Sequence, residues 1–531
     1  MKPVAELNLG YRDAENYKRR ENKNLFNQLF VRTSSLEKVC EPNIFFLVGE
    51  KGTGKTAYAV YFENNQYRKN NSVIRYIRET EYQKFVAMKH KKNLSLSDFT
   101  NIWKVIIYLL LAEQIISSET DNPWWNKFFK LRSLQNAIDE FYKKAFAPEI
   151  IYAINFVEES ELAAKLISKY VDVGSKDRAS VSFSESRFQI NLTYIQRQFE
   201  EALTALKLQR NHLLFIDGID IRPGAINYND YLDCIKGLAN AIWSVNNDFF
   251  ANIKDSPGRL RVVLLVRPDI FYKIGLQNLN SKIRDNSIVL NWLTTYREYR
   301  NSPLFLMADK LLSFQQEKAL NLGEAWAHYF PFDTPRLREP QTSTSSFITF
   351  LRYSLYRPRD FLAIMSILRE NFIEQGRRHN EVFQVSDFRD PAFTRKYSDY
   401  LLGEVRDHLV FYYSSEDWEK FVQFFQFLNG NSRFDYTIYC EAFKSFVSSL
   451  KNNGESVPEF CSSPDNFLQF LYDLNVLGYV VETNDGPFFG WCFRDRSISN
   501  IAPKVRKGVR YEVHYGLMKS LDLGKTLYTT G

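Results

Sequence analysis

The fold is decided by the stretch Ile44-Phe45-Phe46-Leu47-Val48, which runs directly into Gly49-Glu50-Lys51-Gly52-Thr53-Gly54-Lys55-Thr56. The residues that follow, Ala57-Tyr58-Ala59-Val60-Tyr61-Phe62, read as the start of a helix. An apolar strand, a G-x-x-x-x-G-K-T loop and a helix in this order form a phosphate-binding site, because glycines let backbone amides turn inward and the helix N-terminus adds partial positive charge. The alternative is a glycine turn with an exposed lysine, and the apolar strand argues against it.

Each part of this loop has an expected role in holding a nucleoside triphosphate. Lys55 is expected to reach the β- and γ-phosphates, and Thr56 to ligate Mg²⁺. The backbone of the loop is expected to surround the phosphates through Gly49, Gly52, Thr53 and Gly54.

A second G-K-T, at Gly524-Lys525-Thr526, lacks the same context. The position five residues before Gly524 is Lys519 instead of glycine, and no apolar strand leads into it. We therefore interpret it as part of a surface tail.

Composition limits the class of protein. The chain has 531 residues, enough for two to four domains, and 45% are hydrophobic, which is ample for cores. The net charge of +7, from 69 basic and 62 acidic residues, permits nucleic-acid contact through a local patch without demanding it. Five scattered cysteines without a C-x-x-C, and dispersed histidines, argue against disulfides or zinc and favour a reducing cytoplasm.

We expect no membrane segment in this chain. The N-terminus lacks the apolar core of a signal peptide. The most apolar stretch, Trp103 to Ile116, contains two charged residues and is too short to span a bilayer, so it predicts a buried helix.

Apolar strands alternate with helices in the first part of the chain, which predicts an α/β fold with a parallel sheet covered on both faces. The long insert at 97–205 is predicted to be mostly helical, with a hairpin of Val181 and Phe183 against Phe188, Ile190 and Leu192. Besides 44–48, the predicted strands are 72–77, 212–217, 261–267 and 287–290, and a helix is predicted at 231–245.

The rest of the chain is predicted to be mainly helical. Successive helices from 295 to 372 form a lid, and a proline-containing joint follows at 387–392. Helices at 417–427, 436–450 and 464–474, then strands at 476–481 and 488–493 around Asn484-Asp485-Gly486, outline a winged helix. The predicted domains are a P-loop core at 1–294, a helical lid at 295–390 and a winged-helix region at 391–531.

Two carboxylates follow the strand at 212–217. Asp217 ends this buried strand, the expected place for the carboxylate that binds the Mg²⁺ water shell. Asp220 is our candidate for the base that positions the attacking water. In the alternative, Asp220 begins a turn, pairs with Arg222 and is closed by Pro223-Gly224; hydrolysis would then be slow and the protein a nucleotide-gated switch.

Arginines at two other places are candidates for sensing the γ-phosphate. Arg267 ends the strand at 261–267, at the edge where a nucleotide crevice is expected; the alternative is a surface arginine before a helix. Arg359 lies at a helix start in the lid, and the alternative there is an ion pair with Asp360. Arg284, in a predicted exposed loop, is a weaker candidate for an arginine finger to a neighbouring subunit, against a solvated charge.

These segments occur in an order that resembles the AAA+/STAND branch of P-loop ATPases: Gly49–Thr56, Leu213–Asp220, Leu264–Arg267 and Arg357–Asp360. The D-G-x-D second motif and the R-P-D strand end resemble a prokaryotic group of this branch. The lid followed by a winged helix resembles origin-recognition-type ATPases. Most AAA+ ATPases carry a glutamate directly after the residue that corresponds to Asp217, whereas this chain has Gly218.

The resemblance implies binding of ATP and Mg²⁺, homo-oligomers formed through nucleotide-bridged interfaces, and a role in assembly or signalling. Many bacterial proteins similar to this one act in anti-phage defence, so a protein effector is an expected partner. The missing glutamate implies slow turnover.

Two alternative functions remain open. One is a DNA-binding initiator or loader, since the region from Trp491 to Gly531 carries a local excess of basic residues that is able to contact DNA or RNA. The other is a scaffold that holds nucleotide without hydrolysing it. The basic residues of this region are Arg494, Arg496, Lys504, Arg506, Lys507, Arg510, Lys519 and Lys525.

Overall fold

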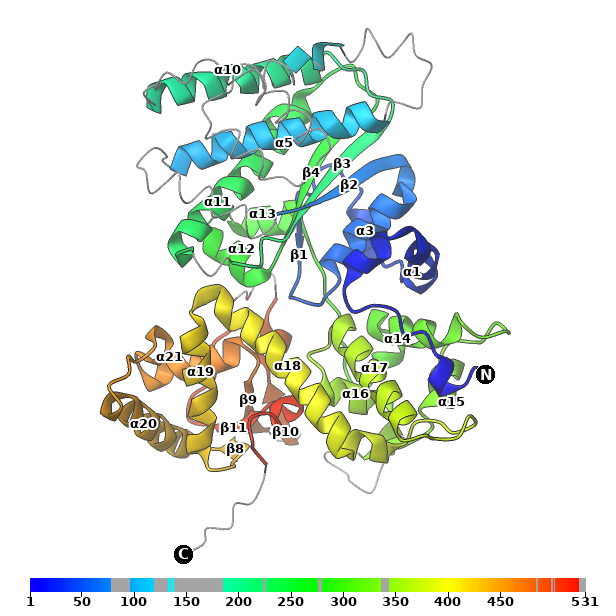
Figure 1. Ribbon diagram of the computed structural model, residues 1–531, viewed down its shortest axis with the longest axis vertical. Coiled ribbons are helices and arrows are strands. Elements are labelled where there is room, and N and C mark those ends of the chain that lie inside the picture. Colours follow the sequence, from blue (N-terminus) through cyan, green and yellow to red (C-terminus); the bar gives the residue numbers. More distant parts are fainter. Residues whose placement is uncertain are drawn as a thin grey trace, which may run out of the picture. The chain divides into compact units, whose positions relative to one another are not determined.

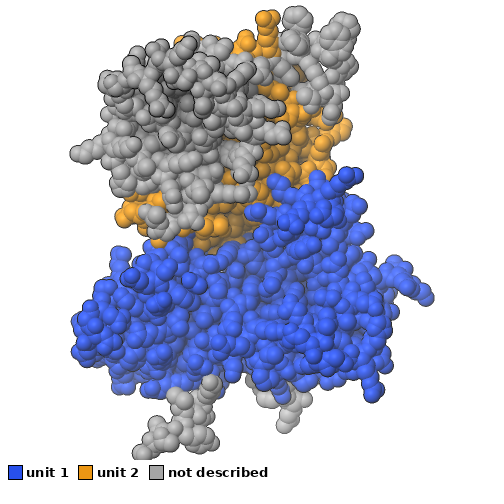
Figure 2. All heavy atoms as spheres, viewed as in Figure 1, with its two compact units in different colours: residues 1–33, 51–54, 291–531 blue, residues 34–50, 55–290 orange. Residues whose placement is uncertain are grey.

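The computed structural model describes residues 1–77, 96–118, 132–134, 136–137, 185–222, 226–275, 279–335, 343–483, 486–497, 500 and 502–524. They form two compact units (Figure 2). The parallel-sheet unit comprises residues 34–50 and 55–290, and the helical unit comprises residues 1–33, 51–54 and 291–531. The middle of the glycine loop therefore groups with the helical unit, whereas its two ends group with the parallel-sheet unit. The three domains expected from the sequence stay a prediction.

The parallel-sheet unit contains a five-stranded, all-parallel sheet in the order β2-β3-β4-β1-β5 (Figure 1). All seven residues of β4 are buried, as expected for a strand covered on both faces. The predicted parallel α/β sheet is confirmed. Its strands are β1 (Phe46–Val48), β2 (Asn70–Tyr76), β3 (Asn211–Asp217), β4 (Leu260–Val266) and β5 (Ser287–Val289).

The order of the strands makes the carboxyl end of β1 the place where a ligand is expected to bind. From β1 the chain goes to β2 at the far edge, and β3 and β4 then fill the space between them. The chain finally crosses β1 to form β5 on its other side. Open parallel sheets bind ligands where the direction of the connections reverses in this way.

Helices flank this sheet, with α3 on one side and α11 and α12 on the other (Figure 1). The two long helices of the insert, α5 and α10, pack against each other, and α5 packs on α11. The helices of the unit are α2 (Ser34–Lys38), α3 (Lys55–Asn65), α5 (Leu96–Ser118), α10 (Glu185–Thr204), α11 (Tyr228–Ser244), α12 (Pro268–Ile274) and α13 (Leu279–Asn286).

The predicted hairpin in the insert is wrong where the structure describes it. Phe188, Ile190 and Leu192 lie within helix α10 instead of a strand. The buried positions of this helix follow one another at helical spacing, from Leu192 to Ile195 and Phe199, so the short alternating run was a coincidence within an amphipathic pattern. Val181 and Phe183 lie outside the described residues.

Helix α5 is longer than the apolar stretch from Trp103 to Ile116 that was predicted to be too short to span a bilayer. It has 23 residues, and within it Phe99–Ser118 is long and apolar enough to cross a membrane by length and composition alone. However, 72% of that apolar window is buried inside the protein. This burial fits a core helix and confirms the predicted packing.

The first part of the helical unit combines the N-terminal residues with the predicted lid helices. Lys310 donates a hydrogen bond of 2.8 Å to the Phe30 carbonyl, and Arg369 donates one of 2.5 Å to the Ala5 carbonyl. The N-terminus is thereby fixed to this unit. The elements are α1 (Lys23–Leu29), α14 (Pro303–Ser313), α15 (Glu324–Tyr329), β6 (Asp333–Pro335), β7 (Ser343–Ser345), α16 (Phe347–Tyr353) and α17 (Pro358–Glu374).

The C-terminal part of the helical unit has helices followed by an antiparallel sheet in the order β10-β9-β11-β8. Ser414, Asp435 and Ser463 cap α19, α20 and α21, which explains where these predicted helices begin. The elements are α18 (Pro391–Tyr412), α19 (Ser415–Phe424), β8 (Arg433–Phe434), α20 (Tyr436–Asn452), α21 (Pro464–Asp473), β9 (Leu477–Thr483), β10 (Gly486–Gly490), α22 (Cys492–Asp495) and β11 (Arg510–Val513).

The second strand predicted for this region is shorter than expected. It was predicted at 488–493, but β10 ends at Gly490 because the chain turns into α22 at Cys492. Asn484 and Asp485 of the predicted turn lie outside the described residues.

Candidate functional site

The glycine loop follows β1 and has the backbone that its sequence predicts. Gly52 and Gly54 have φ angles of +84° and +93°, in the left-handed region that glycine adopts without strain. The Gly49 amide donates to the Val266 carbonyl at 3.1 Å, which fixes the start of the loop on β4. Helix α3 begins at Lys55. Strand, glycine loop and helix therefore occur in the expected order.

Lys55 is buried at the start of α3, with 6% of its surface exposed. Its ammonium donates hydrogen bonds to the carbonyls of Gly49, at 2.9 Å, and Glu50, at 3.3 Å. Burial lowers the pKa of Lys55, although the nearby carboxylates of Asp220 and Asp217 act in the opposite direction. A partly desolvated ammonium at this place is a strong partner for a phosphate.

Asp217 and Thr56 meet at the end of β3. The Thr56 hydroxyl donates to one Asp217 carboxylate oxygen at 2.6 Å, and the Gly218 amide donates to the other at 2.8 Å. Burial and the Asp220 carboxylate raise the pKa of Asp217, against the opposing effects of Thr56 and Lys55. A bound cation would stabilise the charged form of this buried carboxylate, which lies beside a second one.

The donor set suits magnesium. Mg²⁺ is held by one or two protein oxygens together with phosphates and water, and Thr56 and Asp217 supply oxygens of this kind. Within the described part of the chain, no group of three or more His, Cys, Asp and Glu side chains forms a metal cluster. The residues therefore fit a magnesium ion shared with a nucleotide and do not form a complete protein cage.

Gly218, directly after Asp217, has a backbone conformation that needs glycine. Its φ angle is +90°, a backbone conformation that residues other than glycine rarely adopt. A Cβ atom here would lie 2.6 Å from the Ile77 carbonyl oxygen. The backbone therefore disfavours glutamate, or any residue with a Cβ atom, at this position.

Asp220 lies on the segment that follows β3 and is partly exposed. This segment is held by the buried Tyr231 of α11, whose hydroxyl is 2.7 Å from the Ile219 carbonyl and 3.1 Å from the Ile221 carbonyl. No local pattern in the sequence indicates this anchor. Asp220 acts electrostatically on both Lys55 and Asp217, which places it in the same cluster.

The turn proposed as the alternative role for Asp220 is described only in part. Arg222 donates to the Ile226 carbonyl. Pro223 and Gly224 lie outside the described residues.

Arg267 is buried, with 2% of its surface exposed, so the interpretation as a surface arginine is wrong. It is the N-cap residue of α12, and its guanidinium forms two contacts with Asp269, of which Nε to Oδ1 is 3.0 Å long. Its charge also lowers the pKa of Lys55, which places it near the cluster. To contact a phosphate, the Arg267 guanidinium has to release the Asp269 carboxylate or bind both groups at once.

The middle of the glycine loop is anchored within the helical unit by Arg357, a residue that sequence analysis did not select. Its Nη1 donates to the Lys51 carbonyl at 3.1 Å. Its Nε and Nη2 donate to the buried Asp360 carboxylate, the latter at 2.7 Å. Burial alone would lower the pKa of Arg357, but Asp360, with Tyr400 and Glu404, outweighs this effect and raises it.

Arg359 lies against the same loop. Its amide is 3.4 Å from the Gly52 carbonyl oxygen, and a Cβ atom at Gly52 would lie 3.0 Å from the Cβ of Arg359. The expected alternative, an ion pair between Arg359 and Asp360, is wrong because Arg357 takes that carboxylate. The Arg359 guanidinium instead lies 3.5 Å from Glu404.

Trp292 supplies a further anchor for the loop that the sequence did not indicate. Its indole Nε1 donates to the Thr53 carbonyl at 2.8 Å, and the ring is buried. Arg357 and Trp292 thus bind the carbonyls of Lys51 and Thr53 and fix the backbone of the loop there.

The predicted site residues therefore fall into two groups. Within the parallel-sheet unit, the structure brings together Lys55, Thr56, Asp217, Asp220 and Arg267. Within the helical unit, Arg359 lies beside Gly52.

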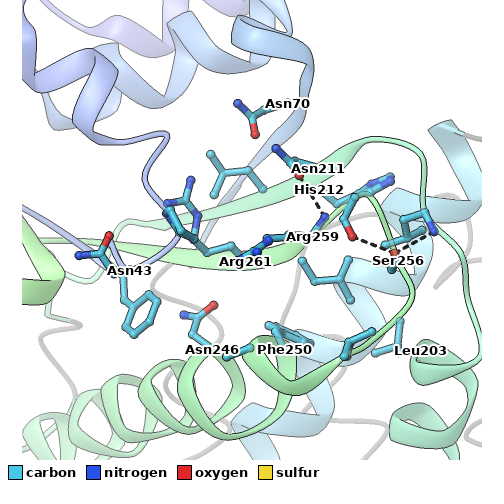
Figure 3. Close-up of a pocket in the computed structure, with 18 of the residues that line it drawn as sticks. Asn43, Asn70, Leu203, Asn211, His212, Asn246, Phe250, Ser256, Arg259 and Arg261 are labelled. Atoms are coloured by element: carbon cyan, nitrogen blue, oxygen red, sulfur yellow. Dashed lines mark hydrogen bonds between the residues drawn. The ribbon is translucent and has the colours of Figure 1, made fainter.

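A cavity of about 640 Å³ in the parallel-sheet unit is lined by residues at the amino ends of β2, β3 and β4, the opposite end of the strands from the glycine loop. Figure 3 shows the residues that line it. Its polar side chains are used to hold the strand ends. Arg261 donates to the Val39 carbonyl at 2.7 Å, and the Asn246 carboxamide binds backbone groups of Val262 at 2.8 and 2.9 Å. We therefore interpret this cavity as structural.

Arg284 does not lie in an exposed loop. It is exposed in the last turn of α13, where Lys282 stacks 4.2 Å from the Trp243 ring. Nothing in this geometry selects Arg284 as a finger.

Several basic residues of the C-terminal region have partners inside the unit. Arg494 lies 4.8 Å from the centre of the Tyr356 ring and donates to its hydroxyl at 2.7 Å. Lys507 pairs with Asp465, and Arg510 pairs with Glu482. These pairs reduce the charge available to a nucleic acid, and Lys525 lies outside the described residues.

Comparison with known proteins adds no assignment to this geometry. Neither a scan against protein-family models nor a search of curated proteins gives a match for this chain.

Proposed function

We propose that the chain binds ATP with Mg²⁺ and hydrolyses it slowly. The observation that carries this proposal is the 2.6 Å hydrogen bond from Thr56 to the buried Asp217, beside the buried Lys55. These three side chains lie where a glycine loop and two parallel strands end, which is the place where an open α/β sheet binds a nucleotide.

Each residue has a defined task in this proposal. The loop amides and Lys55 bind the phosphates, while Thr56 and Asp217 hold the metal, which neutralises phosphate charge when bound. Asp220 orients the attacking water, because the backbone at Gly218 disfavours a glutamate there. Turnover is slow because Asp220 is three residues further along a partly exposed segment.

Nucleotide binding is tested by calorimetry with ATP and Mg²⁺. We expect Lys55→Ala and Asp217→Asn each to weaken binding by about a hundredfold, since each removes a charged contact worth about 2–3 kcal/mol. Lys525→Ala is the matched control, because it changes the lysine of the second G-K-T, which lacks the strand. Unchanged affinity in Lys55→Ala would refute the proposal.

Hydrolysis is tested separately by phosphate release. Asp220→Asn is expected to lower the rate by about a hundredfold, the usual contribution of a general base, while ATP binding persists. Equal, negligible rates in the intact protein and in this variant would instead support a scaffold that holds nucleotide without turnover.

The nucleotide state is proposed to control assembly or signalling. The order of the four motifs supports membership of the AAA+/STAND branch, and with it a homo-oligomer, a protein effector and a role in anti-phage defence in the cytoplasm. The native mass with and without ATP tests the assembly: a mass that does not change with ATP argues against it.

A winged helix is our proposal for the C-terminal region. The sequence of elements β8, α20, α21, β9 and β10, with the last two strands antiparallel, supports it. Since Arg494, Lys507 and Arg510 have internal partners, the region is better suited to docking a protein than to binding DNA.

The DNA-binding alternative is tested by gel shifts at several salt concentrations. Lys504 and Arg506 are both exposed and serve for charge reversal to glutamate. Salt-sensitive DNA binding that is lost in this double variant would favour the initiator or loader alternative.

A further inference from the structure

Three cations surround one carboxylate at the middle of the glycine loop, all within the helical unit. Glu404 of α18 lies 3.5 Å from the Lys51 ammonium, 3.5 Å from the Arg359 guanidinium and 3.7 Å from the Arg357 guanidinium. Only 12% of its side chain is exposed. We call these four residues the Glu404 cluster.

The carboxylate fits this cluster poorly. Charge-assisted hydrogen bonds have lengths of about 2.7–2.9 Å, and the three ion pairs of Glu404 are all longer. Its Oε2 atom is buried and makes no hydrogen bond to the residues that the structure describes. A phosphate has more oxygens and more charge than one carboxylate, and is therefore a better partner for three cations.

The three cations differ in how firmly they are held. Arg357 is committed, because Asp360 and the Lys51 carbonyl occupy its guanidinium. Lys51 also pairs with Asp407, which is more exposed than Glu404. Arg359 and Lys51 are both partly exposed, so both side chains are able to change partner without uncovering a buried charge.

The cluster lies on the loop that is proposed to hold the nucleotide. The Arg359 backbone contacts Gly52, and Arg357 holds the carbonyl of Lys51. A phosphate bound by this loop and the Glu404 carboxylate therefore require the same positive charge.

We propose that Glu404 is an internal anion that competes with the γ-phosphate for Arg359 and Lys51. This inference rests on the proposed function and assigns a regulatory step to the same site. When ATP binds, Arg359 and Lys51 transfer from Glu404 to the phosphate, and α18 loses its ionic link to the loop. Because α18 leads into α19 and the C-terminal sheet, ATP binding loosens this connection, whereas ADP, which has no γ-phosphate, leaves it intact.

The first test compares ATP and ADP affinities in Glu404→Gln. Removal of the competing charge is expected to tighten ATP binding about tenfold, within the usual range for coupled sites, and to change ADP binding less than about twofold. The matched control is Glu374→Gln, which removes a carboxylate between α17 and α18 that pairs with Lys396 and has no loop contact in the structure. In Arg359→Gln, the additional Glu404→Gln change is expected to give a smaller gain, because only Lys51 is then left to pass from Glu404 to the phosphate.

The second test uses the unmodified chain, so that it does not depend on the folding of a variant. Amide hydrogen exchange across 391–412 is expected to become faster with ATP and Mg²⁺, but not with ADP.

The outcomes separate this inference from the function on which it rests. If the chain binds no ATP, both are wrong. If it binds ATP through Lys55 but Glu404→Gln leaves the affinity unchanged or weakens it, the competition is wrong and the nucleotide site stands. Exchange in α18 that is the same with ATP and ADP also overturns the competition.

Discussion

Two helices, one in each unit, begin with a similar short sequence motif. Helix α12 starts with Arg267-Pro268-Asp269, and α17 starts with Arg357-Pro358-Arg359-Asp360. In both, the arginine is the N-cap residue, proline occupies the first turn, and the arginine folds back onto an aspartate of its own helix. A candidate sensor arginine that caps a helix in this way is largely occupied by its own carboxylate.

The difference between the two starts lies in what surrounds them. Asp360 is fully buried, whereas Asp269 is partly exposed. Tyr356, before the second motif, has a φ of +55°, a strained conformation for a tyrosine. The second motif also has an extra arginine, Arg359, that is not bound to the aspartate. The comparison teaches that the first arginine of each motif is structural, and that the inserted one is able to respond to a ligand.

The largest effect is expected when the carboxylate of Asp360, at the start of α17, is removed. Asp360→Asn removes the carboxylate charge that binds the buried Arg357 at 2.7 Å and leaves only Glu404, 3.7 Å away, which costs about 3–5 kcal/mol of the free energy of unfolding. Urea unfolding measures this loss. A cost below about 1 kcal/mol would show that Arg357 is not committed to Asp360.

Acid is expected to destabilise both units through one buried histidine in each. Burial lowers the pKa of His514, in the helical unit, and of His212, in the parallel-sheet unit, to about 4 from an ordinary value of 6.5. The folded protein keeps both neutral, so the unfolded chain binds more protons between these values. Stability is therefore present above pH 6.5 and is lost as the pH falls to about 4, by up to about 3 kcal/mol for each histidine.

This acid effect is measured as the free energy of unfolding at pH 7 and pH 4.5. His514→Gln and His212→Gln are each expected to reduce its pH dependence. If both variants keep the slope of the unmodified protein, other groups are responsible for it.

Two glycines, Gly52 beside the start of α17 and Gly275 at the end of α12, differ in the space around them. Gly52 lies against Arg359 with a φ of +84°, whereas Gly275 ends α12 with a φ of +64° and more open surroundings. Gly52→Ala is expected to cost about 2 kcal/mol and to weaken ATP binding, since both backbone strain and crowding act. Gly275→Ala is the control, with a cost of about 1 kcal/mol from strain alone and unchanged ATP binding. Thermal unfolding and calorimetry measure both, and equal effects of the two changes would contradict the role of Arg359 beside the loop.

The smallest loss of stability is expected when the carboxylate of Asp269, at the start of α12, is removed. Asp269→Asn removes a partner that is itself partly hydrated, so the free energy of unfolding falls by about 1–2 kcal/mol. Arg267 is then available to a phosphate, and ATP binding is expected to tighten slightly. Urea unfolding and calorimetry of the same variant separate the two effects. Weaker ATP binding would mean that Asp269 positions Arg267 for the ligand.

Local sequence patterns were sufficient to predict the parallel sheet and the part of the candidate site that lies on the glycine loop and at the end of β3. Continuous apolar runs ending in Asp217 and Val266 predicted buried parallel strands, and the glycine spacing before Lys55 predicted the loop. The hairpin at Phe188 was wrong because a short alternating run is also compatible with one face of a helix. Arg357 was passed over in favour of Arg359, although Arg-Pro-x-Asp is a pattern in which the first arginine is able to reach its own helix.

What the sequence alone determined was the parallel sheet, the turn of the glycine loop and the order of its chemical groups, because burial and backbone conformation there depend on neighbouring residues. Only the tertiary structure decided which charges meet. Glu404 lies far along the chain from Lys51 and has no local signal, and Tyr231 and Trp292 bind carbonyls that any residue would provide. Partners of this kind are chosen by packing, since a backbone carbonyl or a single carboxylate becomes specific only through its position in space.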